Sequence, residues 1–110
     1  KLALNALIES TGFHIDAIRV VGGGSKNRLW NQLRADITGI PIFVNTIKEA
    51  TVFGAALTAF KGIGVYSSFE EALSAVRVSE TYKPSQNREL YINLYEQYVK
   101  ALNILKDYYK

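Results

Sequence analysis

The feature that most constrains this chain is a run of three glycines, residues 22–24, between a short apolar segment and a helical pattern. Residues 18–21 before the glycines are mostly apolar and include β-branched side chains, and residues 29–37 after them have helical spacing. Glycine permits a positive φ and lets another group approach the backbone closely. A helix start adds unpaired N–H groups and the positive end of the helix dipole. The order of strand, glycines and helix therefore predicts a phosphate seat in a nucleotide-binding lobe.

The glycine run matches neither of the two common phosphate-binding motifs. No Gly-Lys-Ser or Gly-Lys-Thr is present, so the run is not a Walker A loop, and Asn27 stands where the dinucleotide fingerprint needs Gly or Ala. The residues alone leave two interpretations of the run open, a phosphate site and a simple tight turn. Asn27 also has two interpretations, as the N-cap of the following helix or as a side chain that reads the edge of a base.

The composition excludes several classes of protein. Of the 110 residues, 48% are hydrophobic, which argues against disorder, and the absence of cysteine excludes disulfides and thiolate metal sites. The net charge of +3 comes from dispersed lysines and arginines, so we expect no nucleic-acid partner. The sequence has neither a membrane-spanning stretch nor a signal-peptide pattern, which predicts a cytoplasmic protein without a membrane partner. The chain has no methionine and opens within a helical pattern, so we expect it to be a segment of a longer protein.

Hydrophobic periodicity and turn residues predict an α/β chain. Two short strands should be parallel neighbours joined by a helix in a right-handed crossover. The first of them is almost wholly apolar, which is typical of a central strand covered on both faces. We expect helices at 2–11, 27–38, 51–61, a short one after Ser68 and a long one at 85–108, strands at 17–21 and 41–44, and an extended segment at 77–85.

Four further positions carry specific expectations. Thr51 is the expected cap of the third helix, and Gly54 within that helix indicates the close approach of the sheet or of a ligand. His14 lies in a loop without a second ligand nearby and is expected to be solvated. Tyrosines at helical spacing in the last helix, among them Tyr95, indicate a face docked on its own domain rather than a base-stacking platform.

The sequence resembles the FGGY carbohydrate kinases, particularly their xylulokinase and fuculokinase branches. The resemblance rests first on VVGGGSKNRLWNQLRADITGIP at residues 20–41, which is similar to the C-terminal signature of the family. It continues through EATVFGAAL at residues 49–57, YKP at residues 82–84 and the tyrosine-rich final helix. It therefore covers nearly the whole chain.

The resemblance implies a fold and a site. The fold is part of an actin/hexokinase/Hsp70-like (ribonuclease H-like) nucleotide-binding lobe, with short parallel strands, crossover helices and a long C-terminal helix. Residues 1–110 are expected to be the C-terminal part of that domain. In the family, the positions of Gly23 and Gly24 line ATP with backbone and the position of Asn27 contacts adenine. Gly22 belongs to the same turn, and the block around Gly54 packs beneath the nucleotide.

The resemblance also implies what this chain lacks. The catalytic aspartate, the sugar pocket and the acidic magnesium ligands of the family lie upstream, so no catalytic residue and no metal ligand is assigned here. Asp16 and Asp36 do not occupy the catalytic position, and Asp36 is expected to be a helix-surface or helix-packing residue.

The expected parent activity is transfer of the γ-phosphate of ATP to a hydroxyl of a pentulose or deoxyhexulose. The implied partners are ATP or ADP, Mg²⁺ held elsewhere, and a sugar bound by another lobe. The segment is expected to be inactive alone, and the parent protein could form a homodimer. One alternative is a non-catalytic interaction module that uses the amphipathic C-terminal helix. Another is a small basic nucleic-acid binder, which predicts steeply salt-dependent binding.

Overall fold

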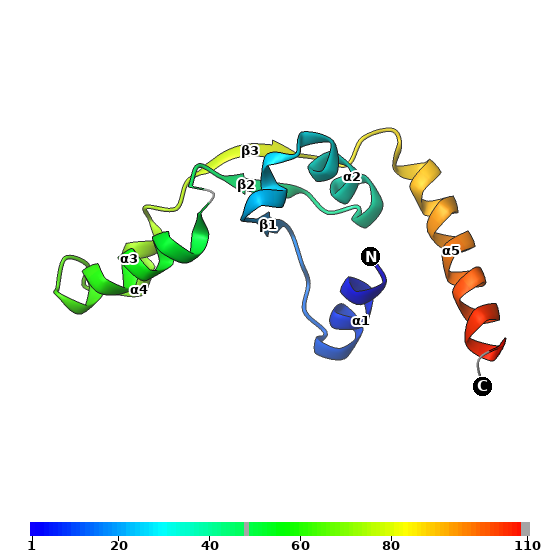
Figure 1. Ribbon diagram of the computed structural model, residues 1–110, viewed down its shortest axis with the longest axis horizontal. Helices are drawn as coiled ribbons and strands as arrows, with labels where there is room; N and C mark the ends of the chain where they lie inside the picture. The colour runs from blue at the N-terminus through cyan, green and yellow to red at the C-terminus, as the bar shows by residue number, and fades with distance from the viewer. Residues whose placement is uncertain (48, 109–110) are drawn as a thin grey trace.

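The computed structural model describes residues 1–47 and 49–108, and it arranges them as a small sheet with helices at both ends (Figure 1). The types and approximate positions of all the elements expected from the sequence are confirmed. In chain order the elements are α1 (Leu2–Thr11), β1 (Ile18–Val20), the 3₁₀ turn η1 (Gly23–Lys26), α2 (Arg28–Thr38), β2 (Ile42–Asn45), α3 (Ala50–Gly62), α4 (Phe69–Leu73), β3 (Val78–Tyr82) and α5 (Arg88–Tyr108).

The sheet has the order β1-β2-β3, with β1 parallel and β3 antiparallel to the central strand β2. The parallel pairing of the first two strands was expected, and the register places Ile18 beside Ile42 and Val20 beside Val44. The prediction that the first strand is central was wrong, because β1 is an edge strand within the described chain. Residues 77–85 were expected only to be extended, but β3 makes the sheet mixed.

The core lies between α2 and one face of the sheet. Ile42, Val44 and Ala35 have no exposed surface, which follows from the alternation of side chains along β2 and from the crossover helix above it. The residues of α2 that are buried are Asn31, Ala35 and Asp36, so two of the three are polar. The apolar stripe at Leu29, Leu33 and Ile37 is only partly covered, and Leu29 remains 70% exposed.

The helix ends follow the expected chemistry except at α3. Gly12 and Gly39 end α1 and α2 in the left-handed conformation, with φ of 69° and 78°. Ser68 accepts a hydrogen bond from Glu71 N and caps α4. The prediction that Thr51 caps α3 was wrong: the N-cap position is Glu49, which makes no side-chain capping bond, and Thr51 lies inside the helix.

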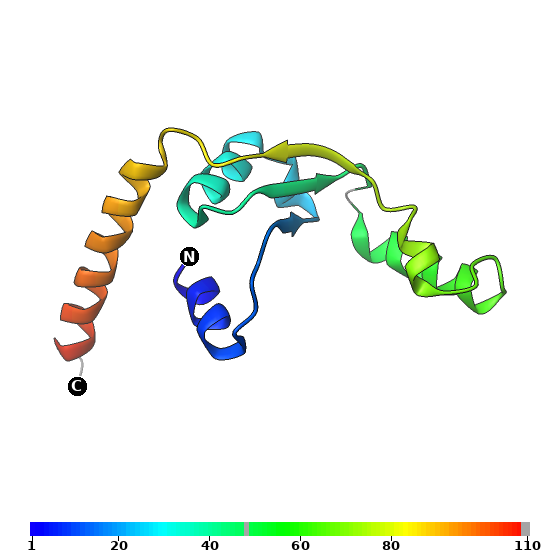
Figure 2. The ribbon, with the colours of Figure 1, turned by 180° about the vertical axis from the view of Figure 1, so that it is seen from behind.

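Helices α3 and α4 form an arm that projects from the end of the sheet (Figure 2). Leu57 of α3 and Ala72 of α4 are buried between them. The base of the arm closes where Thr46 N and Thr46 Oγ1 donate to Arg77 O, at 2.9 and 3.3 Å. The chain therefore leaves the sheet after β2 and returns to it at β3, and these Thr46–Arg77 hydrogen bonds join the two ends of the arm.

Gly54 does not contact the sheet as expected. A Cβ built on it would have no heavy atom within 4 Å beyond the excluded local backbone, although the residue lies inside α3. Packing within the described chain therefore does not explain the glycine.

We expect Gly54→Ala to raise the free energy of unfolding by about 0.5–1 kcal/mol, because alanine restricts the unfolded backbone and has open space in the helix. Urea unfolding followed by circular dichroism measures the change. A decrease in stability would show that the position is closed in solution and would contradict the open geometry.

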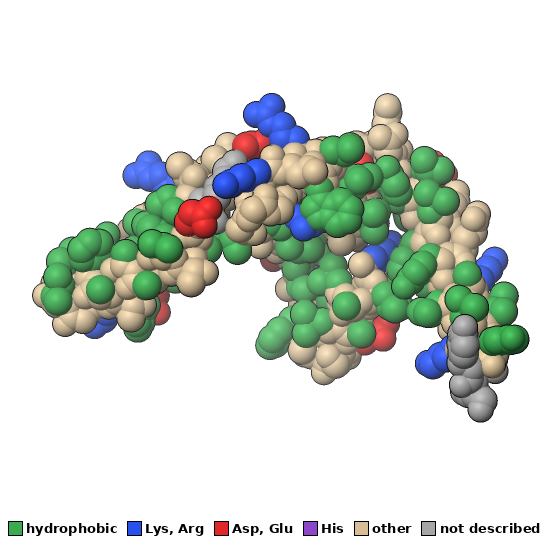
Figure 3. All heavy atoms as spheres, viewed as in Figure 1, with side chains coloured by type: hydrophobic (Ala, Val, Ile, Leu, Met, Phe, Trp, Pro, Cys, Tyr) green, Lys and Arg blue, Asp and Glu red, His purple; other side chains and the backbone are tan. Residues whose placement is uncertain are grey.

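The molecule is elongated, with principal extents of 57 × 34 × 25 Å and a radius of gyration of 18.1 Å. A compact domain of this length has a radius of gyration of about 13 Å. The α3–α4 arm and α5 lie at opposite ends of the long axis (Figure 1). Hydrophobic side chains are visible across the surface (Figure 3), and several exceed 70% exposure, including Val52, Ile63 and Ile104.

The tyrosine face of α5 is docked only in part. Asn5 Nδ2 of α1 donates to Tyr95 Oη at 3.4 Å, and Lys1 Nζ lies 4.8 Å from the centre of the Tyr95 ring. Tyr95 also stacks on Tyr98, which is itself 54% exposed. The expected docking on the same domain therefore holds for Tyr95 and α1, whereas Tyr98 faces solvent.

Candidate functional site

The glycine loop lies where β1 ends, at the edge shared by the carboxyl ends of the two parallel strands. Gly22 has φ 77° and ψ −172°, a region that is essentially restricted to glycine. Gly23 and Gly24 do not have a positive φ, because they begin the 3₁₀ turn η1. Of the three glycines, therefore, only Gly22 adopts the positive φ that glycine permits. Gly23 and Gly24 instead leave an exposed stretch of backbone without side chains.

A buried polar network holds this loop in place. Ser25 is 3% exposed, and its Oγ donates to Gly22 O at 2.7 Å. Asn31 is fully buried, its Nδ2 donates to Ser25 O at 2.8 Å, and its Oδ1 accepts from Arg34 Nη1 at 3.2 Å. A buried amide with satisfied groups fixes geometry better than an apolar contact does. The network thus orients the backbone of residues 22–25.

The sequence analysis did not identify Ser25 or Asn31 as supporting residues. One signal was available, because asparagine is a poor helix former and Asn31 lies inside the helical pattern. An amide that is unfavourable for the helix and lies one turn after a glycine loop indicates a bond back to that loop.

Asn27 is the N-cap of α2, which confirms one of its two interpretations. Its Oδ1 accepts a hydrogen bond from Trp30 N at 3.0 Å. The side chain lies at the exposed side of the loop, and its amide nitrogen is a donor that the capping bond does not use. The second interpretation, contact with a base, is compatible with this geometry.

The start of α3 lies beside the loop. Lys26 Nζ is 3.7 Å from Glu49 Oε1, and both side chains are mostly exposed, so this ion pair contributes little stability. It does show that the loop after β1 and the segment after β2 meet. In open α/β sheets, ligands bind at the carboxyl ends of the strands, where such loops meet.

The charged groups at the other side of the loop belong to α2 and β3. Arg28 Nε is 3.6 Å from Glu80 Oε2, and Tyr82 Oη donates to the same carboxylate oxygen. The hydrogen bond to Glu80 raises the pKa of the Tyr82 phenol, and desolvation raises it further. The tyrosine is therefore a neutral donor that fixes the carboxylate, and the largely exposed Arg28 side chain lies beside that carboxylate at the first residue of α2.

The described residues contain no group of three His, Asp or Glu side chains that could hold a metal ion. His14 pairs with Asp16 at 3.0 Å, and both side chains are almost fully exposed, as expected of a solvated histidine. Asp36 is a buried residue of α2, which agrees with the second of its two expected roles, helix packing, and not with a place on the helix surface. In the part of the chain that is described, no helix has the length and apolar character needed to cross a membrane.

The geometry is that of a strand, a glycine turn and a helix capped by Asn27, at the carboxyl edge of the two parallel strands. Residues 1–63 match the C-terminal domain of the FGGY family of carbohydrate kinases. The match covers more than half of the chain, and the chain belongs to this family.

Curated relatives agree with this assignment. Over 77 aligned residues the chain is 43% identical to an L-fuculokinase of Haemophilus influenzae. The aligned region covers 70% of this chain and 16% of that relative. Over 90 aligned residues it is 37% identical to an autoinducer-2 kinase of Yersinia enterocolitica, and this alignment covers 80% of this chain and 17% of that relative. The chain therefore spans about a sixth of the length of these relatives.

Solved structures share the fold. A ligand-bound xylulose kinase from Lactobacillus acidophilus superposes with a TM-score of 0.83 at 25% identity, over 94% of this chain and 21% of that one. A gluconate kinase from the same organism superposes with a TM-score of 0.80 at 24% identity, over 93% of this chain and 21% of that one. The resemblance stated from the sequence is confirmed, and the fold agrees with that of the FGGY kinases.

Proposed function

We propose that residues 1–110 form the C-terminal part of the nucleotide-binding lobe of a sugar kinase. The whole enzyme would transfer the γ-phosphate of ATP to a hydroxyl of a pentulose or deoxyhexulose, in the cytoplasm. Family membership supports the reaction class, and the fuculokinase and xylulose kinase neighbours support the sugar class. The alternative interaction module is supported by none of these comparisons.

One observation of the structure carries the proposal. The Gly22 turn exposes the backbone of Gly23 and Gly24 at the carboxyl edge of the parallel strands, and a Cβ on Gly23 would meet no heavy atom within 4 Å. A nucleotide can therefore approach that backbone without a side chain in the way. In this proposal Gly22 sets the turn, Gly23 and Gly24 line the nucleotide, and Asn27 contacts the adenine.

The residues of this chain position the nucleotide but do not perform the chemistry. When ATP binds, it supplies the phosphoryl group, and Mg²⁺ neutralises charge on its phosphates. The carboxylates that would hold the magnesium and the base that would take the sugar proton are proposed to lie outside this chain. We therefore expect residues 1–110 alone to show no kinase turnover.

An amide NMR titration of the isotopically labelled chain with ATP and magnesium tests the proposal. A helix start contributes about 0.3–2 kcal/mol toward an anion, whereas millimolar binding needs about 4 kcal/mol. We therefore expect millimolar or weaker binding, with shifts confined to residues 22–27 and 51–56. Sodium sulfate at matched ionic strength is the control. A folded spectrum in which ATP shifts other residues and leaves residues 22–27 unchanged would contradict the assignment of these residues.

A further inference from the structure

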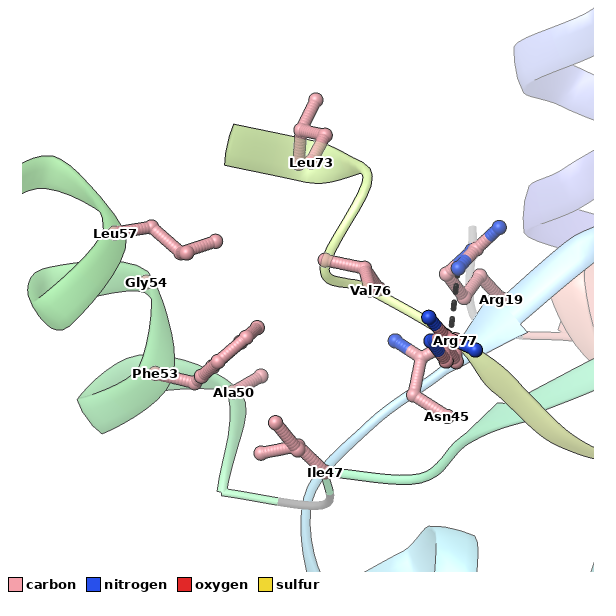
Figure 4. Close-up of a pocket in the computed structure, with 10 residues that line it drawn as sticks. All are labelled: Arg19, Asn45, Ile47, Ala50, Phe53, Gly54, Leu57, Leu73, Val76 and Arg77. Carbon is pink, nitrogen blue, oxygen red and sulfur yellow. Dashed lines mark hydrogen bonds between the residues drawn. The ribbon is translucent and has the colours of Figure 1, made fainter. Parts of the chain in front are cut away.

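A cavity of about 250 Å³ lies between the α3–α4 arm and the adjoining end of the sheet, and no residue of the glycine loop lines it (Figure 4). Its walls are mainly apolar and include Phe53 and Leu57 of α3. The cavity is slightly smaller than typical ligand pockets, which hold about 300–1,000 Å³. A ligand that fits it is therefore small.

The polar groups of the cavity gather at one end and are cationic or amide. Figure 4 shows Arg19, Asn45 and Arg77 together, opposite the apolar side chains of α3. Arg19 Nη1 donates to Asn45 Oδ1 at 3.0 Å, which holds this guanidinium at the cavity. No carboxylate lines the cavity among the described residues, and within them neither guanidinium has a carboxylate at ion-pair distance. Two positive charges therefore face one end of an apolar hollow.

Gly54 supplies the second observation, because it lines the same cavity. Its helical position does not require glycine, and no other heavy atom approaches the site of its missing Cβ within 4 Å. A glycine inside a helix costs stability relative to alanine. The effect of the missing side chain in this structure is to keep the apolar half of the cavity open.

We propose that this cavity binds a small organic anion with an apolar body. The apolar part would lie against Phe53 and over Gly54, and the carboxylate would lie between Arg19 and Arg77. Guanidinium groups match a carboxylate in shape and charge, and an apolar wall favours an aryl or alkyl body over a bare inorganic anion. None of residues 22–27 lines this cavity, although it shares Phe53 and Gly54 with the segment 51–56, where ATP is also expected to cause shifts.

The test uses the labelled 110-residue chain and phenylpropanoate, with the neutral phenylpropanol as the matched ligand. We expect saturable amide shifts at residues 19, 45, 53–57 and 76–77. The alcohol should bind about twofold to fivefold more weakly than the carboxylate, as expected for the loss of an exposed ion pair. Equal binding of the alcohol, or shifts spread over all exposed apolar faces without saturation, would overturn the proposal.

Two substitutions test the two halves of the cavity. Gly54→Leu fills the apolar half and should weaken phenylpropanoate binding by about tenfold or more, whereas Val52→Leu, on an exposed part of the same helix, should leave binding unchanged. Arg77→Gln removes one charge, keeps the fold, and should weaken binding by about twofold to fivefold. Unchanged binding in Arg77→Gln would overturn the proposal even if Gly54→Leu fails to fold.

The cavity and the glycine loop are distinguished by crossing the variants. Arg77→Gln should leave the ATP-induced shifts at residues 22–27 intact, and Gly22→Ala should leave phenylpropanoate binding intact. Loss of both ligands in either variant would show a single coupled site and would refute separate binding.

Discussion

Replacing Gly22 with alanine is expected to abolish the ATP-induced shifts at the glycine loop and to lower the free energy of unfolding by about 1–3 kcal/mol. The reason is conformational, because φ 77° with ψ −172° is a backbone region that a Cβ excludes on steric grounds. No heavy atom lies within 4 Å of the position of that Cβ, so the effect does not come from a clash with a neighbour. The loop must instead change its path, which also breaks the bond from Ser25 Oγ to Gly22 O.

Gly23→Ala is the matched control for the stability effect. Gly23 is adjacent, exposed, in the 3₁₀ turn and without a positive φ, so alanine fits its backbone. We expect its stability to change by less than about 0.5 kcal/mol, as at an ordinary surface site. Urea unfolding and the ATP titration measure both variants. Equal stability of Gly22→Ala and the unmodified chain would show that the strained turn does not persist in solution.

The second large effect is expected at Asp36, the 1% exposed carboxylate of α2. Its Oδ1 accepts from Ser85 N at 2.6 Å and from Gln32 Nε2 at 3.0 Å, and Gln32 Nε2 also donates to Lys83 O at 2.9 Å. These bonds fasten the segment between β3 and α5 to α2. Asp36→Ala leaves Ser85 N without its acceptor and should lower the free energy of unfolding by about 2–4 kcal/mol.

Asp36→Asn removes the charge but keeps the side-chain volume and one acceptor oxygen. Asparagine keeps an acceptor oxygen of the same size at the same place, so we expect it to lose less than half as much stability as alanine does. Urea unfolding gives the energies, and amide hydrogen exchange at Ser85 and along α5 reports the fastening directly. Fast exchange of Ser85 N in the unmodified chain would contradict the assigned bond.

The local elements were predictable because their signals are local. Gly12 and Gly39 end helices as expected, and Ser68 and Asn27 cap them, since each acts through bonds within a few residues. The parallel pairing of β1 and β2 followed from the helix between them. The positions of the glycine loop and of Asn27 could also be predicted, because a motif and its resemblance to a family point to them.

Features that depend on distant segments could not be predicted in the same way. The antiparallel pairing of β3 with β2 requires the chain to return to the sheet after the whole α3–α4 arm. The residue pattern of 78–82 does not indicate which edge of the sheet these residues join. The burial of Asp36 and Asn31 depends on partners that the helix pattern does not reveal. The apolar run of residues 18–21 predicted burial on both faces, but within the described chain β1 has a neighbour on only one side.

The closure of the arm at Thr46 and Arg77 has a topological consequence. Strands β2 and β3 are antiparallel neighbours, so the segment between them is, in effect, the turn of a β-hairpin enlarged into two helices. A loop closed at one point adds little entropic cost as it lengthens, since doubling its length costs only about 0.6 kcal/mol. The tip of the arm between α3 and α4, residues 63–68, can therefore vary in length while β2 and β3 keep their register.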